Sequence, residues 1–561
     1  MKSSILKRVF RITTALFFTQ FSVSAQEIDI NVVYQSAMSA YDSKDYKEAS
    51  NQFTALIDNV EFKIKNASVY YNGACIYALN NQPKKAFKLL EYLINEKLYS
   101  NYKHISTDSD LESLHTSNQW AEIMGKVKAN LTTQPERNRE MIKKRLIEAK
   151  SLLDNDNGKL WEENIWHTDF LILDFDNTIY TLKPIVGFKT TDSTLYYSKM
   201  NENELSFSNS VQEYMGKEYA TILISYLTDD GSTFIHELFH TLQNKHITLN
   251  GEPIVYLDNY DARQWLRLEF KALKTTLQSI MNNQELEKIK LHFNDALLFR
   301  KIRQTKYKEH LTKELEIETL EGLAQYTGVK LSNTKSVYAD AITEIDEREA
   351  APTYGRPFPY ATGLAYGLIF DYLNIEWKKG LDSSYNFLEI YEKKVIKKEL
   401  AITDTLVLQA KSRNNFKQIH QEELAKKIEQ EKLIDFYSEM FFKKPTLSVT
   451  SINNNYGRSY DMYGTLTLDS SSIVYSRIKG TAQSKENFGN FYIKEDIAKL
   501  GTTGILGTWV GGDVLKFTFP LPEKIEDNKI IGEFYVIELN EGWEVVKVNS
   551  KGNLEIVKKI E

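Results

Sequence analysis

The chain has 561 residues, a formal net charge of −6 and a single cysteine. Its length predicts about three or four domains. The net charge shows no strong bias and the sequence has no basic stripe, which argues against a nucleic-acid partner. Because Cys75 cannot form an intrachain disulfide, a hydrophobic core must hold the fold together, and we expect Cys75 to be a small core residue.

Residues 1–25 are typical of a secretory signal peptide. Basic residues precede a moderately apolar run that ends in small residues: Lys2, Lys7, Arg8 and Arg11, followed by Ser22 to Ala25. We expect cleavage after Ala25 and a periplasmic or secreted mature protein. The apolar run is too short and too polar for a stable membrane span, so none is expected after cleavage.

Residues 26–135 are predicted to be helical and repetitive. Small and aromatic residues recur in two segments, from Ala40 to Phe53 and from Tyr70 to Leu90, at a spacing typical of paired helices. These segments resemble tetratricopeptide repeats. The resemblance implies a stacked helical domain, which either binds a protein partner or only buttresses the rest of the chain.

An apolar stretch followed by two aspartates is the first candidate catalytic motif along the chain. The run Leu171-Ile172-Leu173-Asp174-Phe175-Asp176-Asn177-Thr178 resembles the first motif of haloacid-dehalogenase-like phosphatases. The resemblance would make Asp174 the nucleophile and Asp176 the general acid. The alternating strands and helices that such a family needs do not follow Thr178. We therefore favour a strand followed by an Asx-rich turn.

The run His236-Glu237-Leu238-Phe239-His240 carries the most specific chemistry in the chain. Residues four apart share one face of a helix, so two imidazoles at this spacing can bind one Zn²⁺. The glutamate after the first histidine reaches a water on that metal. Apolar neighbours predict a buried side for this helix, and the polar run Asp229 to Ser232 is a plausible start signal.

A catalytic zinc usually has three protein ligands, so a third must lie elsewhere. His246 has the metzincin spacing, but Gln243 stands where that pattern needs a glycine to leave the helix. Glu269 is surrounded by cations, which favours an ion pair or a buried arginine partner. Glu321 is the better candidate, because it lies on a predicted helix ended by Gly328 and is followed by small residues that allow close helix packing.

The His-Glu-x-x-His motif followed by Glu-Gly-Leu-Ala-x-Tyr at 321–326 resembles the gluzincin zinc peptidases, which include thermolysin-like and aminopeptidase-N-like enzymes. The resemblance implies that His236, His240 and Glu321 bind zinc and that Glu237 is the general base. It covers two short helices, and the gap between them is longer than in the aminopeptidases. That departure leaves exo- or endopeptidase action open.

Gluzincins also use a tyrosine or histidine to stabilise the oxyanion, which must form opposite the metal. The segment 351–363, placed before an expected helix from about Leu364, has suitable side chains. Tyr360 is our prediction, with Tyr366 and Arg356 as substitutes. Before the zinc motif, Tyr219 to Leu227 is rich in β-formers. It is predicted either as an edge strand that pairs with a peptide or as an ordinary strand.

The fold is therefore predicted to be α+β, multidomain and mostly helical. A gluzincin-like domain would span 136–442 and end in a charged helix from Lys411 to Met440. Residues 443–561, rich in β-formers and turns, would form a small antiparallel β-domain of unassigned role. We expect an exported zinc metallopeptidase that cleaves peptides or proteins. The alternatives are a non-catalytic exported binding scaffold and, less favoured, the phosphatase.

Overall fold

The computed structural model divides the chain into two compact units, Met1–Lys144 and Arg145–Glu561, which are considered separately. The structure describes residues 30–60, 67–201, 204–249, 251, 254–378, 380–381, 384–451, 456–461, 464–469, 471–482, 484–494, 498–511 and 514–559. The predicted signal peptide, 1–25, lies outside these residues. Among the described helices, none is both long and apolar enough to cross a membrane.

The first unit is helical, as expected. Its elements are α1 (Ile30–Asp42), α2 (Tyr46–Val60), α3 (Ala67–Leu79), α4 (Pro83–Asn95), α5 (Tyr102–Thr107), the 3₁₀ helix η1 (Ser109–Leu114) and the part of α6 (Asn118–Asp156) up to Lys144. Helix α1 packs on α2, and α3 packs on α4. Helices α2 and α3 also approach closely, which depends on Gly73 of α3, where an added Cβ would lie 2.1 Å from the ring of Phe53 of α2. Cys75 is buried in this core, and the expected domain boundary at 135 falls inside α6.

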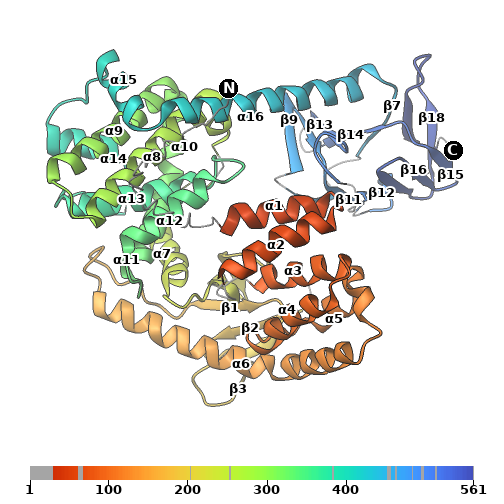
Figure 1. The fold of residues 1–561 in the computed structure, drawn as a ribbon, viewed down its shortest axis with the longest axis horizontal. Coiled ribbons are helices and arrows are strands. Elements are labelled where there is room, and N and C mark those ends of the chain that lie inside the picture. The colour runs from red at the N-terminus through yellow and green to blue at the C-terminus, as the bar shows by residue number, and fades with distance from the viewer. Residues whose placement is uncertain are drawn as a thin grey trace, which may run out of the picture. The chain divides into compact units, whose positions relative to one another are not determined.

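The second unit contains a six-stranded sheet ordered β3-β4-β2-β1-β6-β5. Figure 1 labels β1, β2 and β3 of this sheet. Its strands are β1 (Phe170–Asp174), β2 (Thr178–Thr181), β3 (Lys189–Thr190), β4 (Tyr196–Lys199), β5 (Ser210–Tyr214) and β6 (Lys217–Leu223). Strands β1 and β6 are parallel, and the other neighbours are antiparallel.

Of the two alternatives for Tyr219 to Leu227, the ordinary strand is confirmed up to Leu223 and the edge strand is wrong. Strand β6 lies between β1 and β5, and the chain then forms a 3₁₀ helix, η2 (Ile224–Tyr226). The edge is β5, because the chain reverses through Met215 and Gly216, both of which have positive φ. Two such residues in succession form a tight hairpin, which pairs β5 on the outer side of β6.

The two-aspartate motif forms a β-hairpin. Strands β1 and β2 pair in antiparallel fashion on either side of it, and Asn177 takes a φ of 65° in the turn. The Asp176 carboxylate accepts a 2.9 Å hydrogen bond from the Thr178 N–H and pairs with Lys199. This is the strand and Asx-rich turn that we favoured from the sequence, since no helix follows the motif.

Helices form most of the remainder of this unit up to residue 443. They are α7 (Ser232–His246), η3 (Val255–Asp258), α8 (Tyr260–Met281), α9 (Leu286–Lys306), η4 (Lys308–His310), α10 (Leu311–Ile317), the π-helix η5 (Glu318–Gly322), α11 (Leu323–Leu331), α12 (Val337–Glu349), α13 (Phe358–Tyr372), α14 (Phe387–Tyr391), the π-helix η6 (Glu392–Ile396), α15 (Asp404–Arg413), α16 (Phe416–Ser438) and the π-helix η7 (Glu439–Lys443).

Three expected helix boundaries were wrong. Gly328 does not end its helix, which continues to Leu331; an added Cβ at Gly328 would lie 2.4 Å from the Ser232 carbonyl oxygen, so this glycine lets α11 pack on α7. Helix α13 begins at Phe358 and not near Leu364, with proline in its first turn. The charged helix from Lys411 is broken between α15 and α16, where Asn415 has a φ of 55°.

The C-terminal region contains two sheets, ordered β18-β19-β7-β14-β13-β10-β9 and β15-β16-β17-β12-β11-β8. The strands are β7 (Thr446–Thr450), β8 (Tyr456–Tyr460), β9 (Thr465–Asp469), β10 (Ser472–Tyr475), β11 (Ile478–Ala482), β12 (Gly489–Ile493), β13 (Ile505–Gly511), β14 (Val514–Pro520), β15 (Lys524–Glu526), β16 (Lys529–Ile531), β17 (Tyr535–Leu539), β18 (Trp543–Lys547) and β19 (Leu554–Lys558).

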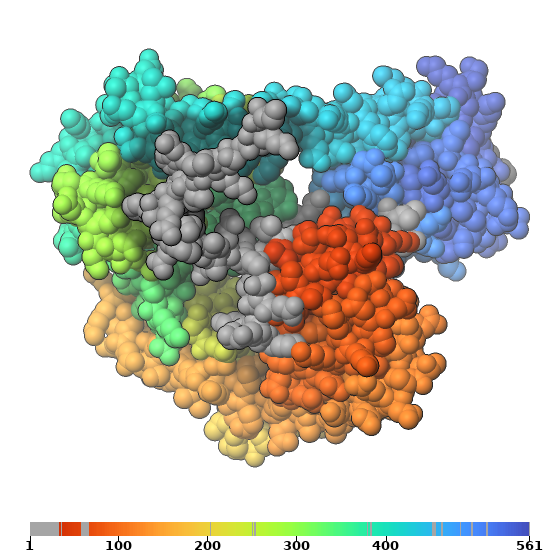
Figure 2. Space-filling view, viewed as in Figure 1, coloured from red at the N-terminus to blue at the C-terminus, as the bar shows by residue number. Residues whose placement is uncertain are grey.

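These sheets are mostly antiparallel, as predicted, but β19 and β7 are parallel neighbours. Aromatic residues from both sheets, among them Phe491 and Phe517, share one core. A second cluster joins Tyr437 of α16 and Phe441 of η7 to Leu466 and Val474. Figure 2 accordingly shows the end of α16, in cyan, continuous with the packed blue surface of the strands.

Candidate metal centre

Helix α7 positions the two motif histidines. Gly231, with a φ of 79°, precedes the helix, and the Asp230 carboxylate accepts a 3.0 Å hydrogen bond from the Ser232 N–H. This carboxylate satisfies one of the free N–H groups at the helix start. The apolar side of the helix is fully buried, through Phe234, Ile235, Leu238, Phe239 and Leu242. Because that side is buried, both histidines face the neighbouring helical segment that carries Glu321.

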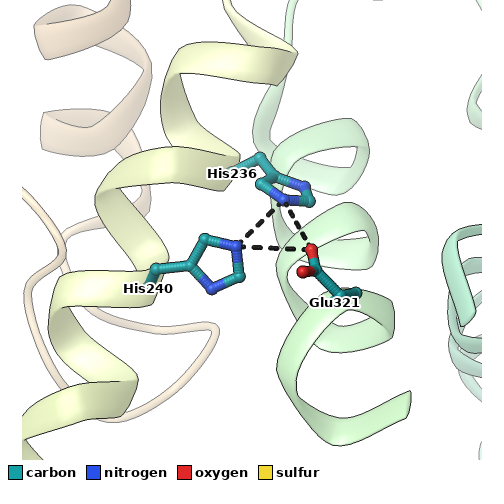
Figure 3. Close-up of side chains that lie close together, drawn as sticks. All are labelled: His236, His240 and Glu321. Atoms are coloured by element: carbon teal, nitrogen blue, oxygen red, sulfur yellow. Dashed lines mark hydrogen bonds and ion pairs between the residues drawn. The ribbon is translucent and has the colours of Figure 1, made fainter. Parts of the chain in front are cut away.

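His236 and His240 project from α7 towards Glu321, which comes from the adjacent helical segment (Figure 3). The two Nε2 atoms are 3.1 Å apart, and each lies 3.6 Å from Glu321 Oε2. Donors about 2.1 Å from a tetrahedral Zn²⁺ are separated from one another by roughly 3.4 Å. The donor types and their spacing therefore fit one zinc ion with three protein ligands.

Glu321 lies on η5, one turn of π-helix, and the neighbouring helix α13 approaches that turn closely. An added Cβ at Gly322 would lie 2.9 Å from the Gly363 Cα. The small residue after Glu321 thus serves the close helix packing expected from the sequence. Burial alone would raise the pKa of the Glu321 carboxyl, but the adjacent imidazoles of His236 and His240 and the hydrogen bond from Tyr360 hold that pKa well below its usual range.

Two glutamines orient the imidazoles from behind. Gln325 Oε1 lies 3.1 Å from His236 Nδ1, and Gln243 Oε1 lies 2.9 Å from His240 Nδ1. An amide oxygen accepts only from a protonated Nδ1, so both Nε2 lone pairs are free for a cation. Gln325 in turn donates to Glu344.

The sequence reasoning did not assign these glutamines a role. Gln325 lies four residues after Glu321, on the same helix face, and this spacing was an available signal. Gln243 was considered only as an obstacle to the metzincin pattern. No sequence signal identified Glu344, because it comes from a separate helix, α12.

Glu237 is half-buried beside the two histidines. Its Oε1 accepts a 2.9 Å hydrogen bond from the side-chain amide of Asn209. Asn209 comes from the loop before β5 and was not singled out from the sequence, since a lone polar loop residue carries no signal by itself.

The three oxyanion candidates have different positions. The Tyr360 hydroxyl donates to Glu321 Oε2 at 2.6 Å, and its ring lies parallel to that of His236, with centroids 5.7 Å apart. Arg356 is half-exposed, and its Nη2 lies 3.4 Å from Glu321 Oε1. Tyr366, our other substitute, is fully buried and donates to Glu269, so that prediction was wrong. Tyr366 lies six residues after Tyr360, on a different face of α13, which directs it into the helical core.

The two rejected zinc ligands lie away from the pair. His246 is the last residue of α7, and its Nε2 is 2.6 Å from Glu163 Oε2. Glu269 is fully buried and pairs with Arg300 and Arg303 of α9, which agrees with the buried arginine partner considered from the sequence.

Comparison with known proteins finds no relative: no family model, curated protein or solved structure matches this chain.

Proposed function

We propose that the protein is an exported zinc metallopeptidase that hydrolyses peptide bonds. The observation that carries the proposal is the triangle of His236 Nε2, His240 Nε2 and Glu321 Oε2, with sides of 3.1, 3.6 and 3.6 Å, next to Glu237. Two imidazoles and one carboxylate are the ligand set of many hydrolytic zinc sites. When bound there, zinc would polarise a substrate carbonyl and make a water molecule more acidic.

Each side chain has a separate task in this proposal. His236, His240 and Glu321 hold the cation, with the glutamines fixing the imidazoles. Glu237 accepts the proton of the attacking water and later delivers it to the leaving amine. Tyr360 donates a hydrogen bond to the oxygen that becomes negative during attack, after its hydroxyl has moved away from Glu321.

The expected partners follow from the same proposal. The substrate is a peptide or protein in the periplasm or outside the cell. The paired helices of the first unit would act as tetratricopeptide-like repeats that hold a protein partner.

The decisive experiment measures zinc content and peptide cleavage together. We expect one zinc equivalent per chain and cleavage of a peptide library, and Glu237→Gln should retain zinc while losing roughly 1000-fold or more in kcat. Glu163→Gln is the matched control, because Glu163 pairs with His246 and lies outside the site; it should behave like the wild type. A zinc-free protein, or undiminished cleavage by Glu237→Gln, would overturn the proposal.

A further inference from the structure

Asn209 connects the open edge of the first sheet to the proposed general base. It lies one residue before β5, the edge strand, and is half-buried. Its Nδ2 donates to Glu237 Oε1 at 2.9 Å, and its Oδ1 accepts from the Leu223 N–H at 2.9 Å. Leu223 is the last residue of β6, so one side-chain amide contacts the end of a strand and the zinc helix α7.

The second hydrogen bond determines which way the amide faces. The oxygen and nitrogen of an asparagine amide are distinguished by their hydrogen-bonding partners. A backbone N–H such as that of Leu223 can be satisfied only by the carbonyl oxygen of Asn209. The NH₂ group must therefore face Glu237, where a carboxylate oxygen accepts it.

We infer that Asn209 is a positioning residue, which holds the Glu237 carboxylate in the orientation needed to receive a proton. The inference rests on the proposed function. A glutamate side chain has three rotatable bonds, and fixing them before reaction removes an entropic cost from the catalytic step. Because the amide contacts Oε1, Oε2 remains available to the water. A neutral donor also orients the carboxylate without adding a full positive charge beside it.

Two substitutions separate this role from a merely structural one. Asn209→Ala removes both hydrogen bonds. Asn209→Asp retains an acceptor for the Leu223 N–H but sets a carboxylate against Glu237. Gln212→Ala is the matched control, since the Gln212 amide donates to the Ser206 carbonyl and to Thr221 on the same sheet edge and has no contact with Glu237 among the described hydrogen bonds.

The expected result is a fall in kcat of about 10- to 100-fold in both Asn209 variants, the size of loss that a misplaced catalytic group causes. KM should change by less than about 3-fold, because substrate binding does not use this contact. Zinc content and the thermal midpoint should stay near those of the wild type, and Gln212→Ala should keep its kcat.

A double-mutant cycle isolates the coupling to Glu237. In the Glu237→Gln background, Asn209→Asp should cause no further loss, because residues that act as a unit are not additive. A full additional loss there, or a change confined to KM, would show that Asn209 does not act through Glu237. If Glu237→Gln itself were fully active, the proposed function would fail instead.

Crystal structures of the zinc-loaded variants test the inference without any activity. In Asn209→Asp, the Glu237 carboxylate should rotate away from residue 209, while β5 and β6 keep their pairing. An unchanged Glu237 side chain in both Asn209 variants would overturn the inference even if no substrate had been found.

Discussion

Two glutamates on one π-helical turn have opposite surroundings. Glu318 is fully buried, and both its carboxylate oxygens accept from Arg300, at 2.6 and 2.7 Å. Glu321, three residues later, meets the imidazoles of His236 and His240. The first belongs to what we call the buried charge cluster, which consists of Glu269, Arg300, Arg303, Glu314 and Glu318.

The difference lies in what satisfies each carboxylate. In the buried charge cluster, the carboxylates pair with guanidinium groups that are always charged. Burial alone would lower the pKa of Arg300, but Glu269 and Glu318 raise that pKa well above its usual value. At the candidate metal centre, the partners are imidazoles, which are neutral when they bind a metal. A glutamate is therefore suited to a structural or a metal-binding role according to the residues that neighbouring helices bring to it, and both kinds of surroundings occur within one turn.

The largest effect should come from removing a proposed ligand of the candidate metal centre. Glu321→Ala leaves two imidazoles without their carboxylate, and we expect zinc affinity to fall by at least about 100-fold, more than the loss typical of an outer-shell change. Competition with a chelator of known affinity measures this. Glu316→Ala, a glutamate on the preceding helix α10, is the control. Equal zinc affinities in the two variants would contradict the ligand assignment.

Breaking the buried charge cluster should affect stability instead. Glu318→Ala leaves Nη1 and Nη2 of Arg300 buried without their carboxylate acceptors, although Glu269 still pairs with its Nε. The free energy of unfolding should therefore fall by about 3–5 kcal/mol, measured by urea denaturation. Asp346→Ala breaks a partly exposed ion pair with Lys274 and should cost less than about 1 kcal/mol. Similar losses in both variants would remove the distinction between the two regions.

The Tyr360 hydroxyl should matter more for the rate of hydrolysis than for zinc affinity. Tyr360→Phe keeps the ring beside His236 but removes the hydroxyl, so kcat should fall by about 100-fold, as for other oxyanion donors. Zinc affinity should fall by less than about 10-fold. Tyr372→Phe, at the end of the same helix, is the control. If the Tyr360 variant loses zinc with no separate loss in kcat, its hydroxyl serves only to hold Glu321.

The smallest effect concerns pH. Burial alone would raise the pKa of Asp371, but hydrogen bonds from Lys330, Lys378 and Tyr326 lower it from 3.8 to about 2. A lowered folded-state pKa stabilises the protein above pH 3.8, and this contribution is lost as the pH falls towards 2. Because the group is partly exposed, the contribution is about 1–2 kcal/mol.

Asp371→Asn should therefore be less stable than the wild type at neutral pH, and the difference should shrink between about pH 4 and 2. Urea denaturation of the zinc-free protein at several pH values measures it. Asp154→Asn, at a half-exposed aspartate, is the control. A difference that does not depend on pH would show that Asp371 is not stabilised as a carboxylate.

Much of the fold and of the candidate site could be predicted from local patterns. The apolar side of α7 is buried as the spacing of Ile235, Leu238 and Phe239 indicated, and the helical N-terminal region and the β-rich C-terminal region were expected. Glu321 was selected because its neighbours are small, and Gly322 does pack against Gly363. The sequence left open whether Tyr219 to Leu227 forms an edge strand or an ordinary strand, because the order of strands in a sheet depends on pairing partners and not on β-propensity.

The sequence alone determined that His236 and His240 share a helix face with Glu237 between them, because helical periodicity acts over a few residues. It also indicated that Glu321 begins a closely packed helical segment. Only the tertiary structure decided that Glu321 meets the histidines while Glu318 meets Arg300, and that Asn209 reaches Glu237. Those contacts join segments far apart in the chain, and packing between elements, which no local pattern encodes, brings them together.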